Sequence, residues 1–161
     1  MMHILKPPTP LIISQRPAIF LAGSIAMGAA SAWQTEVELA LHDHAGTILN
    51  PRRDAWDATW EQSVDFAPFH EQVTWELGAQ EQADLIAMYF DPATQAPITL
   101  LELGLFAHTG KVIVCCPTGF WRKGNVDIVC QRYTIPTVPD LPALIEVLGQ
   151  WLRSRVRSSS R

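Results

Sequence analysis

Two carboxylates beside apolar stretches are the residues of this chain best suited to chemistry. Glu102 is the one charged residue between Pro92 and Ala107, and Asp84 directly precedes the apolar run Leu85–Phe90. An ionised carboxylate among leucines loses hydration, so it must be paired, used in a helix cap or kept for chemistry. In retaining glycosyl transfer one carboxylate attacks the anomeric carbon while another group handles the proton of the leaving group. Glu102 and Asp84 are candidates for these two roles.

Each carboxylate also has a structural interpretation. Thr99 and Glu102 have the spacing of a helix capping box, in which the glutamate would bind the amide at the helix start. Asp84 could equally be a solvated residue that ends the preceding helix. Gly104 would allow close approach of another backbone beside Glu102. The pattern alone leaves these alternatives open.

Other polar and aromatic residues could bind a planar ligand or a sugar. Gly23 and Ser24 form a strand-to-helix turn that could hold a sugar hydroxyl, although it lacks the G-x-G-x-x-G spacing and the Walker lysine. Indole rings could stack on a nucleobase, or could pack in the core, at Trp56, Trp60, Trp75 and Trp121. The edge of such a base could bind Asp54, Glu76 or Asn125. The histidines and cysteines lack the spacings of metal sites, and we expect no metal and no cofactor.

The hydrophobic pattern predicts the elements that position these residues. Strands are expected over residues 16–24, 47–50, 83–90 and 111–116, and helices over 29–42, 70–82, 98–108 and 140–152. Residues 52–69 are predicted to form a long loop, and the pattern at 125–133 is ambiguous. Ser31 to Gln34 fits a capping box for the first helix.

This alternation predicts a single-domain α/β fold, a doubly wound, Rossmann-like and mostly parallel sheet flanked by helices. Such sheets bind ligands at the carboxyl ends of their strands, where residues 23–24, 50–54, 91–99 and 117–125 would lie. Glu102 is expected to point toward the same rim. The expected boundaries are an N-terminal extension over 1–16, the domain over 17–152 and a basic disordered tail over 153–161.

Composition limits the class of protein. The chain has 161 residues with 48% hydrophobic content, enough for one soluble domain. No apolar run reaches the roughly 18 residues that a membrane span requires. We find no export signal, and three cysteines are expected to be free thiols in a cytoplasmic protein. A net charge of −4 does not suit a nucleic-acid-binding protein.

Taken in order, several short motifs resemble the nucleoside 2-deoxyribosyltransferase family. They are Ile19–Ser24, Asn50–Asp54, Gln72–Glu76, Ala83–Asp84 and Pro97–Gly104, and Phe120–Val126 extends the similarity. The resemblance implies a fold related to flavodoxin, in which Glu102 attacks C1′ of a 2′-deoxynucleoside to form a deoxyribosyl ester. The sugar then passes to a free nucleobase, as nucleotide salvage requires.

The resemblance also implies roles for further residues. Asp84 would assist the departing base, and Asn125 would reach the 5′ side of the sugar in a neighbouring subunit, which makes the protein a homo-oligomer with shared active sites. Gly23, Ser24, Asp54, Trp75 and Glu76 would bind substrate. Members carry a second aspartate where this chain has Ala96, and a tyrosine near the end of the first strand, for which Ser24 is the candidate substitute.

Two alternatives remain at this point. One is hydrolysis of a 2′-deoxynucleoside or of its 5′-monophosphate, whose phosphate would bind Arg52 or Arg53. The other is a nucleotide-binding module without turnover.

Overall fold

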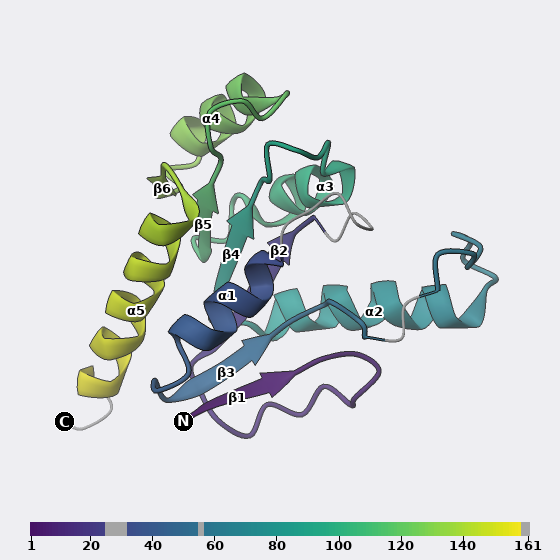
Figure 1. The fold of residues 1–161 in the computed structure, drawn as a ribbon, viewed down its shortest axis with the longest axis horizontal. Coiled ribbons are helices and arrows are strands. Elements are labelled where there is room, and N and C mark those ends of the chain that lie inside the picture. The colour runs from purple at the N-terminus through teal and green to yellow at the C-terminus, as the bar shows by residue number, and fades with distance from the viewer. Residues whose placement is uncertain (25–31, 55–56, 159–161) are drawn as a thin grey trace.

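The core of the molecule is a parallel sheet (Figure 1). The computed structural model describes residues 1–24, 32–54 and 57–158, and these form six strands and five helices. The strands are β1 (Met2–Leu5), β2 (Ala18–Gly23), β3 (Gly46–Leu49), β4 (Leu85–Tyr89), β5 (Val112–Cys115) and β6 (Thr137–Val138). They lie in the order β1-β3-β2-β4-β5-β6, and all neighbouring pairs are parallel. The order reverses between β2 and β4, which confirms the predicted doubly wound α/β fold.

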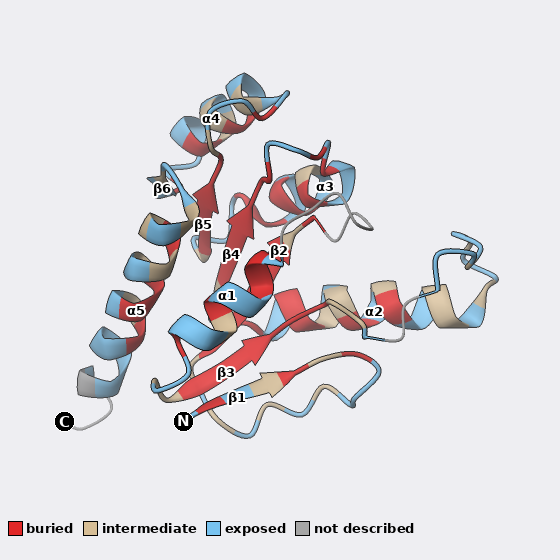
Figure 2. Ribbon diagram, viewed as in Figure 1, coloured by how far each residue is buried: buried red, intermediate tan, exposed pale blue. Residues whose placement is uncertain are grey.

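Helices cover both faces of this sheet. They are α1 (Trp33–Ala40), α2 (Ala67–Gln82), α3 (Pro97–Phe106), α4 (Lys123–Arg132) and α5 (Leu141–Ser158). Alternate strand residues point to opposite faces, so Phe20 packs with α2, α3 and α4, while Ile19 and Leu21 pack with α1 and α5. Figure 2 shows the result, a buried sheet between helices whose outer sides are exposed.

The N-terminal residues belong to the sheet, although the sequence predicted only an extension. Strand β1 pairs with β3 in the register Met2 to Gly46, and the indole of Trp75 donates a hydrogen bond of 2.9 Å to the carbonyl of Thr9. A four-residue edge strand followed by Pro7 and Pro8 gives too little periodicity to be recognised in the sequence.

Three other elements differ from their predicted limits. The ambiguous segment is helix α4, the two-residue strand β6 was not predicted, and α5 continues to Ser158 through most of the expected tail. The guanidinium of Arg155 lies 5.1 Å from the ring of Trp151, one turn earlier, which stabilises this extension. The predicted start of the first helix and its Ser31 cap lie outside the described residues.

The adjacent cysteines lie on opposite faces of the sheet, as predicted. Cys115 belongs to the core under α5, and Cys116 belongs to the core under α4. Both are free and buried, and burial raises the pKa of each thiol above its ordinary value. In the described part of the chain, no helix is long and apolar enough to cross a membrane.

Gly23, at the end of β2, is required by close packing. A Cβ added there would overlap the ring of Trp33 and lie 2.8 Å from the backbone oxygen of Tyr89. Trp33 is fully buried, so its ring cannot move aside cheaply. Gly104 differs, because a Cβ at its exposed position on α3 meets no atom within 4 Å, and no backbone approaches it as the sequence had suggested.

These two glycines make a matched pair of predictions. We expect Gly23→Ala to destabilise the protein by about 2 kcal/mol or more through overpacking. Gly104→Ala should stabilise it by about 0.5 to 1 kcal/mol, because alanine costs less conformational entropy in a helix. Urea unfolding of both variants measures the two effects, and equal stabilities would contradict this account of Gly23.

Candidate active site

Glu102 lies in the middle of α3 with its side chain turned into the molecule. The residue is 7% exposed, whereas its neighbour Leu101 is 58% exposed. Helix α3 begins at Pro97, its N-cap is Ala96 in a left-handed conformation with φ of 46°, and no side chain caps it. Glu102 is therefore more than a turn from the helix start, and the capping-box interpretation is wrong.

A stripe of polar side chains on α2 faces this carboxylate. Gln72, Glu76 and Gln80 recur every four residues, so they lie on one side of the helix. The amide of Gln72 donates hydrogen bonds to the carbonyl of Pro51 at 2.8 Å and to Glu76 Oε1 at 2.7 Å. The amide of Gln80 donates to the backbone carbonyl of Glu76 at 3.2 Å, and it acts on the carboxyl of Glu102, whose pKa it lowers. Helices α2 and α3 thus bring two carboxylates and two amides together on one face of the sheet.

Burial makes both carboxylates weaker acids than usual. It raises the pKa of Glu102 to about 8, the charge of Glu76 adds to this rise, and the Gln80 amide opposes it. Burial also raises the pKa of Glu76 to about 7, and the Gln72 amide opposes that rise. Two such neighbours lose their protons stepwise, so near neutral pH the pair holds one proton between them. One carboxylate can then act as a nucleophile while the other carries a proton.

Asp84 is not brought to Glu102. It precedes β4, at the opposite end of that strand from the rim, and its Oδ2 accepts hydrogen bonds from Arg16 at 2.9 Å and from the amide of Ala18 at 2.8 Å. These contacts tie the starts of β2 and β4 together. A residue that opens a parallel strand lies at the sheet edge away from the ligand, so these contacts favour a structural role for Asp84.

A structural role for Asp84 predicts a small effect on stability and none on turnover. Asp84→Asn should lower the free energy of unfolding by about 1 kcal/mol, because the partly exposed ion pair is screened while the amide of Ala18 keeps an acceptor. Its kcat should stay within about twofold of wild type. Parallel thermal melts and rate measurements check both expectations. A large loss of kcat would show that Asp84 takes part in catalysis.

Ser24 is buried at the carboxyl end of β2, but its hydroxyl is engaged elsewhere. The Thr94 hydroxyl donates to the carbonyl of Asp91 at 3.0 Å, so at 2.7 Å Ser24 donates its proton to Thr94. This chain of hydroxyls joins β2 to the loop before α3. The structure gives Ser24 no contact with Glu102.

Two predicted substrate-binding residues have structural contacts. Trp75 is buried in the core under α2 and holds the N-terminal segment through Thr9, because it lies about a quarter-turn around the helix from Glu76. Asp54 has a side chain 84% exposed and pairs with Lys6 at 3.6 Å. Neither residue joins the polar stripe.

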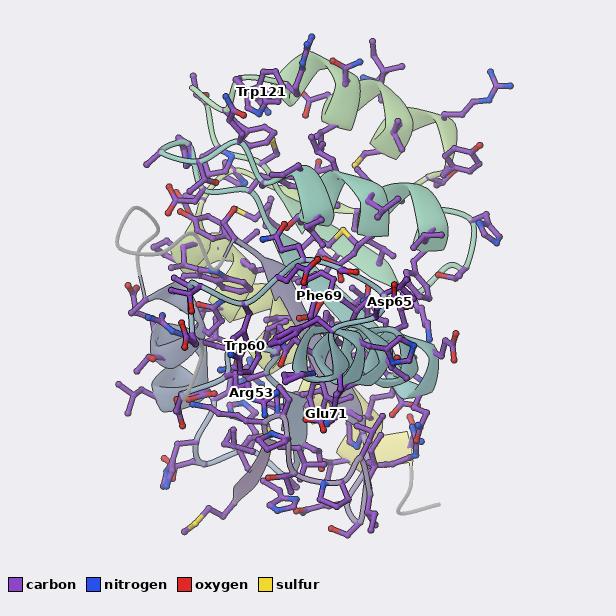
Figure 3. All side chains as sticks on the ribbon, turned by 90° about the vertical axis from the view of Figure 1, so that its right-hand side faces the viewer. Arg53, Trp60, Asp65, Phe69, Glu71 and Trp121 are labelled. Atoms are coloured by element: carbon purple, nitrogen blue, oxygen red, sulfur yellow. The ribbon has the colours of Figure 1, made fainter. Side chains whose placement is uncertain are left out.

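The tryptophans do not form one stacking platform. The ring of Trp60 packs on Phe66 and under the guanidinium of Arg53, which lies 4.9 Å from it and 3.2 Å from Glu71. Figure 3 shows this cluster at the start of α2, with Trp121 well apart from it. Trp121 is half-exposed and donates to the carbonyl of Gln95 at 2.9 Å. Trp56 lies outside the described residues.

Asn125 is exposed in the first turn of α4, on the outside of the molecule. The outer side of neighbouring α3 carries three exposed apolar residues, Ile98, Leu101 and Leu105. Asn125 therefore does not face Glu102 of its own chain in the way that the polar stripe of α2 does.

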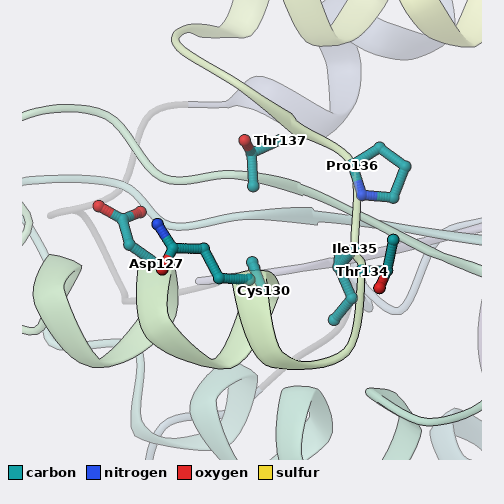
Figure 4. Close-up of a pocket in the computed structure, with 7 residues that line it drawn as sticks. Asp127, Cys130, Thr134, Ile135, Pro136 and Thr137 are labelled. Atoms are coloured by element: carbon teal, nitrogen blue, oxygen red, sulfur yellow. The ribbon is translucent and has the colours of Figure 1, made fainter.

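Two hollows lie at the end of the sheet that carries β6. One, of about 420 Å³, is lined by α4 and β6, including Asp127, Cys130 and Thr137 (Figure 4). A second, of about 260 Å³, continues past Lys123. The Lys123 ammonium is already bound to Asp127 at 3.1 Å and to the carbonyl of Cys116 at 2.9 Å. Within residues 1–24, 32–54 and 57–158, no three potential metal ligands form a cluster.

Sequence reasoning missed Gln72 and Gln80. The detectable signal was their spacing of four residues on either side of Glu76 along one predicted helix. It was overlooked because glutamine is common on exposed helix faces, and the burial of Gln72 and Gln80 arises from tertiary packing, which for Gln72 includes the contact with Pro51.

Comparison with known protein families identifies the family of this chain. Residues 16–120 match the family described as nucleoside 2-deoxyribosyltransferase like. The chain belongs to the nucleoside 2-deoxyribosyltransferase-like family. A search of curated proteins gives no significant match. The matched residues include Glu76, Asp84 and Glu102 and end before Asn125. Membership implies an enzyme of nucleoside metabolism, with nucleosides and nucleobases as substrates.

Proposed function

We propose that the protein cleaves the N-glycosidic bond of a 2′-deoxynucleoside and transfers the deoxyribosyl group to another base through an ester on Glu102. Glu76, rather than Asp84, exchanges the proton with the base. The observation that carries this proposal is the pair formed by the half-buried Glu76 on α2 and the buried Glu102 on α3, whose pKa values are about 7 and about 8. No cofactor takes part.

The first half-reaction uses the singly protonated pair in its minor form, with the proton on Glu76 rather than on Glu102, whose pKa is the higher of the two. A carboxylate oxygen of Glu102 forms a bond to C1′ as the bond from C1′ to the base nitrogen breaks. The electron pair of the broken bond goes to the base, which takes the proton of Glu76. Ester formation removes the charge of Glu102, which had helped to hold that proton on the pair. Nucleophilic attack and proton release therefore assist each other.

The second half-reaction reverses these roles. A nitrogen of the incoming base attacks C1′, the Glu102 ester bond breaks and its electron pair returns to the carboxylate. Glu76 accepts the proton that the incoming base loses. If water attacks instead of a base, the product is free deoxyribose, so hydrolysis is a side reaction of the same site.

We propose a nucleoside rather than its 5′-monophosphate as substrate. Arg53 lies beside the start of α2, and it is already bound to Glu71 and stacked on Trp60, with 13% of its side chain exposed. The polar stripe contributes carboxylates and amides, which suit hydroxyls better than a phosphate dianion.

We also propose that the active protein is a homo-oligomer. The exposed apolar residues on the outside of α3 would be buried by a second subunit. That arrangement places the exposed Asn125 of one subunit near the α3 that carries Glu102 in another, where it could bind the 5′ side of the sugar.

Product analysis tests the proposal. The protein is incubated with deoxyinosine and free adenine, and in parallel with deoxyinosine 5′-monophosphate. Deoxyadenosine and hypoxanthine together are expected from transfer. Hypoxanthine without deoxyadenosine indicates a hydrolase, and unchanged substrates across several bases indicate a binding module. Faster turnover of the monophosphate would contradict our choice of substrate.

A further inference from the structure

Ala96, at the N-cap of α3, has a backbone conformation that costs free energy. Its φ of 46° and ψ of 51° lie in the left-handed region, where the Cβ of an L-residue comes too close to the following carbonyl oxygen. The residue is 5% exposed. A conformation of this kind persists only where the surrounding structure fixes it. The loop from Asp91 to Ala96, between β4 and α3, must therefore be held by its neighbours.

The strand on one side of β4 holds the first half of this loop. Ser24 follows β2, and its hydroxyl lies 2.7 Å from the hydroxyl of Thr94. Thr94 in turn donates to the backbone carbonyl of Asp91 at 3.0 Å, and the side chain of Asp91 accepts a hydrogen bond of 2.9 Å from the amide of Ala93. These bonds join the loop to the end of β2.

The strand on the other side of β4 holds the second half of the loop through Trp121. The carboxyl ends of β2, β4 and β5 lie side by side at one edge of the sheet (Figure 1), and Trp121 belongs to the segment after β5. Its indole N–H donates to the carbonyl of Gln95 at 2.9 Å, directly before the left-handed residue. The preceding residue, Phe120, is buried and packs on the ring of Phe90 with centroids 5.0 Å apart. Trp121 therefore extends from a segment that is anchored in the core.

Helix α3 begins where this second attachment acts. The amide of Leu100 donates to the carbonyl of Ala96 at 3.0 Å, so the conformation of Ala96 directs the first turn of the helix. Glu102 lies six residues after Ala96, which is about 9 Å along the helix axis. A shift or an opening of the first turn therefore moves the carboxylate of Glu102.

We infer that Trp121 is a positioning residue for the nucleophile. This inference rests on the proposed function of Glu102. The indole N–H holds the carbonyl of Gln95, which keeps Ala96 left-handed and fixes the start of α3. Without this bond the loop relaxes toward less strained conformations, and the carboxylate of Glu102 is displaced from C1′. A displacement of about 1 Å can slow a reaction by on the order of a hundredfold. Trp121 acts through the backbone of the loop and not on the substrate.

The test compares Trp121→Phe with a matched control, Trp151→Phe. Phenylalanine keeps an aromatic ring and removes the indole N–H. Trp151 lies on α5, which covers the other face of the sheet, and its ring is 5.1 Å from the guanidinium of Arg155. Trp121 has the same kind of contact with Arg122, at 4.4 Å, so both substitutions alter a cation–π pair.

We expect Trp121→Phe to lower kcat by about tenfold, with KM changed by less than about threefold. The factor should be the same from pH 5 to pH 9, because the substitution removes no titrating group. Trp151→Phe should change neither constant. A variant of Trp121 that raises KM more than it lowers kcat overturns the inference, because that result describes a residue that binds substrate. An unchanged kcat overturns it as well.

Amide hydrogen exchange gives a readout that does not depend on turnover. The amide of Leu100 reports opening of the first turn of α3, and the amide of Leu144, which donates to the carbonyl of Asp140 at 3.0 Å, reports the first turn of α5 in the same way. Trp121→Phe should speed exchange at Leu100 by about threefold to tenfold, as loss of one hydrogen bond does, and leave Leu144 unchanged.

Faster exchange at Leu100 alone supports the role of Trp121 in fixing α3, even if the wild type proves inactive and the proposed function fails. Unchanged exchange at Leu100 overturns the inference, whatever the activity. Equal acceleration at Leu100 and Leu144 also overturns it, because that result describes a residue that stabilises the whole fold.

Discussion

Glu102→Gln is expected to lower the rate of sugar transfer by about 10⁴-fold or more, because an amide is a very poor nucleophile toward C1′. The folded structure should survive the change. Glutamine has nearly the same shape, and the buried site loses a charge that is costly to desolvate. Chromatographic measurement of base exchange gives the rate, and binding of a nucleoside should persist.

The same substitution should stabilise the protein, with a definite dependence on pH. The pKa of Glu102 rises from 4.5 to about 8 on folding, so between these values the folded state binds more protons than the unfolded state. The stability of the wild type therefore falls as pH rises through this window. The advantage of Glu102→Gln should be small at pH 4.5 and on the order of 5 kcal/mol at pH 9, at about 1.4 kcal/mol per pKa unit. The melting temperature at pH 9 should rise by about 10 to 20 °C.

Glu81→Gln is the matched control, since Glu81 is exposed on α2. It should alter neither transfer nor the melting temperature. A Glu102→Gln protein that melts lower than wild type at pH 9 would show that the carboxylate is a structural partner, and retained transfer would exclude it as nucleophile.

Glu76→Gln has the second largest expected effect. Removing the proton donor should lower transfer between natural bases by about 10² to 10⁴-fold, the usual contribution of a general acid. Loss of the second proton from the pair of Glu76 and Glu102, whose pKa values are about 7 and about 8, sets the basic limb of the kcat/KM profile. That limb should disappear in the variant. Rates measured from pH 5 to pH 10 check both expectations.

A substrate with a better leaving group separates proton donation from binding. In 4-nitrophenyl 2-deoxyriboside the leaving group departs as a stabilised 4-nitrophenolate, so formation of the Glu102 ester from this substrate needs no acid. Glu76→Gln should therefore release nitrophenol at close to the wild-type rate. An equal loss on both substrates would mean that Glu76 binds the sugar or supports the fold, and Glu81→Gln again serves as the control.

Much of the fold follows from local patterns in the sequence. Runs such as Ile19–Leu21 and Val112–Cys115 are apolar throughout, as strands buried on both faces must be, and they alternate with segments of helical periodicity. The two edge strands could not be predicted from such local patterns. β1 has four residues and β6 has two, which is too short for a periodic signal, and their pairing depends on neighbours distant in the chain.

The candidate site was only partly predictable, for a related reason. Glu102 was found because a lone charge in an apolar stretch is visible in the sequence. The rule that ligands bind at the carboxyl ends of strands already argued against Asp84, which opens its strand. Glu76 was predicted to bind substrate, but its pairing with Glu102 arises from the packing of α2 beside α3. The burial of Gln72 and Gln80 also depends on segments distant in the chain, such as Pro51 for Gln72, and no local pattern encodes it.

Trapping the covalent intermediate tests the central claim most directly. The protein is mixed with a 2-fluoro-2-deoxyarabinosyl nucleoside, whose fluorine destabilises the oxocarbenium-like transition states and slows breakdown of the ester, then quenched in acid, digested and analysed by mass spectrometry. We predict that the peptide containing Glu102 gains the mass of one fluorinated sugar, and that the modified residue is Glu102 itself. Base release without any adduct, or an adduct on another residue, would contradict the assignment of Glu102 as the nucleophile.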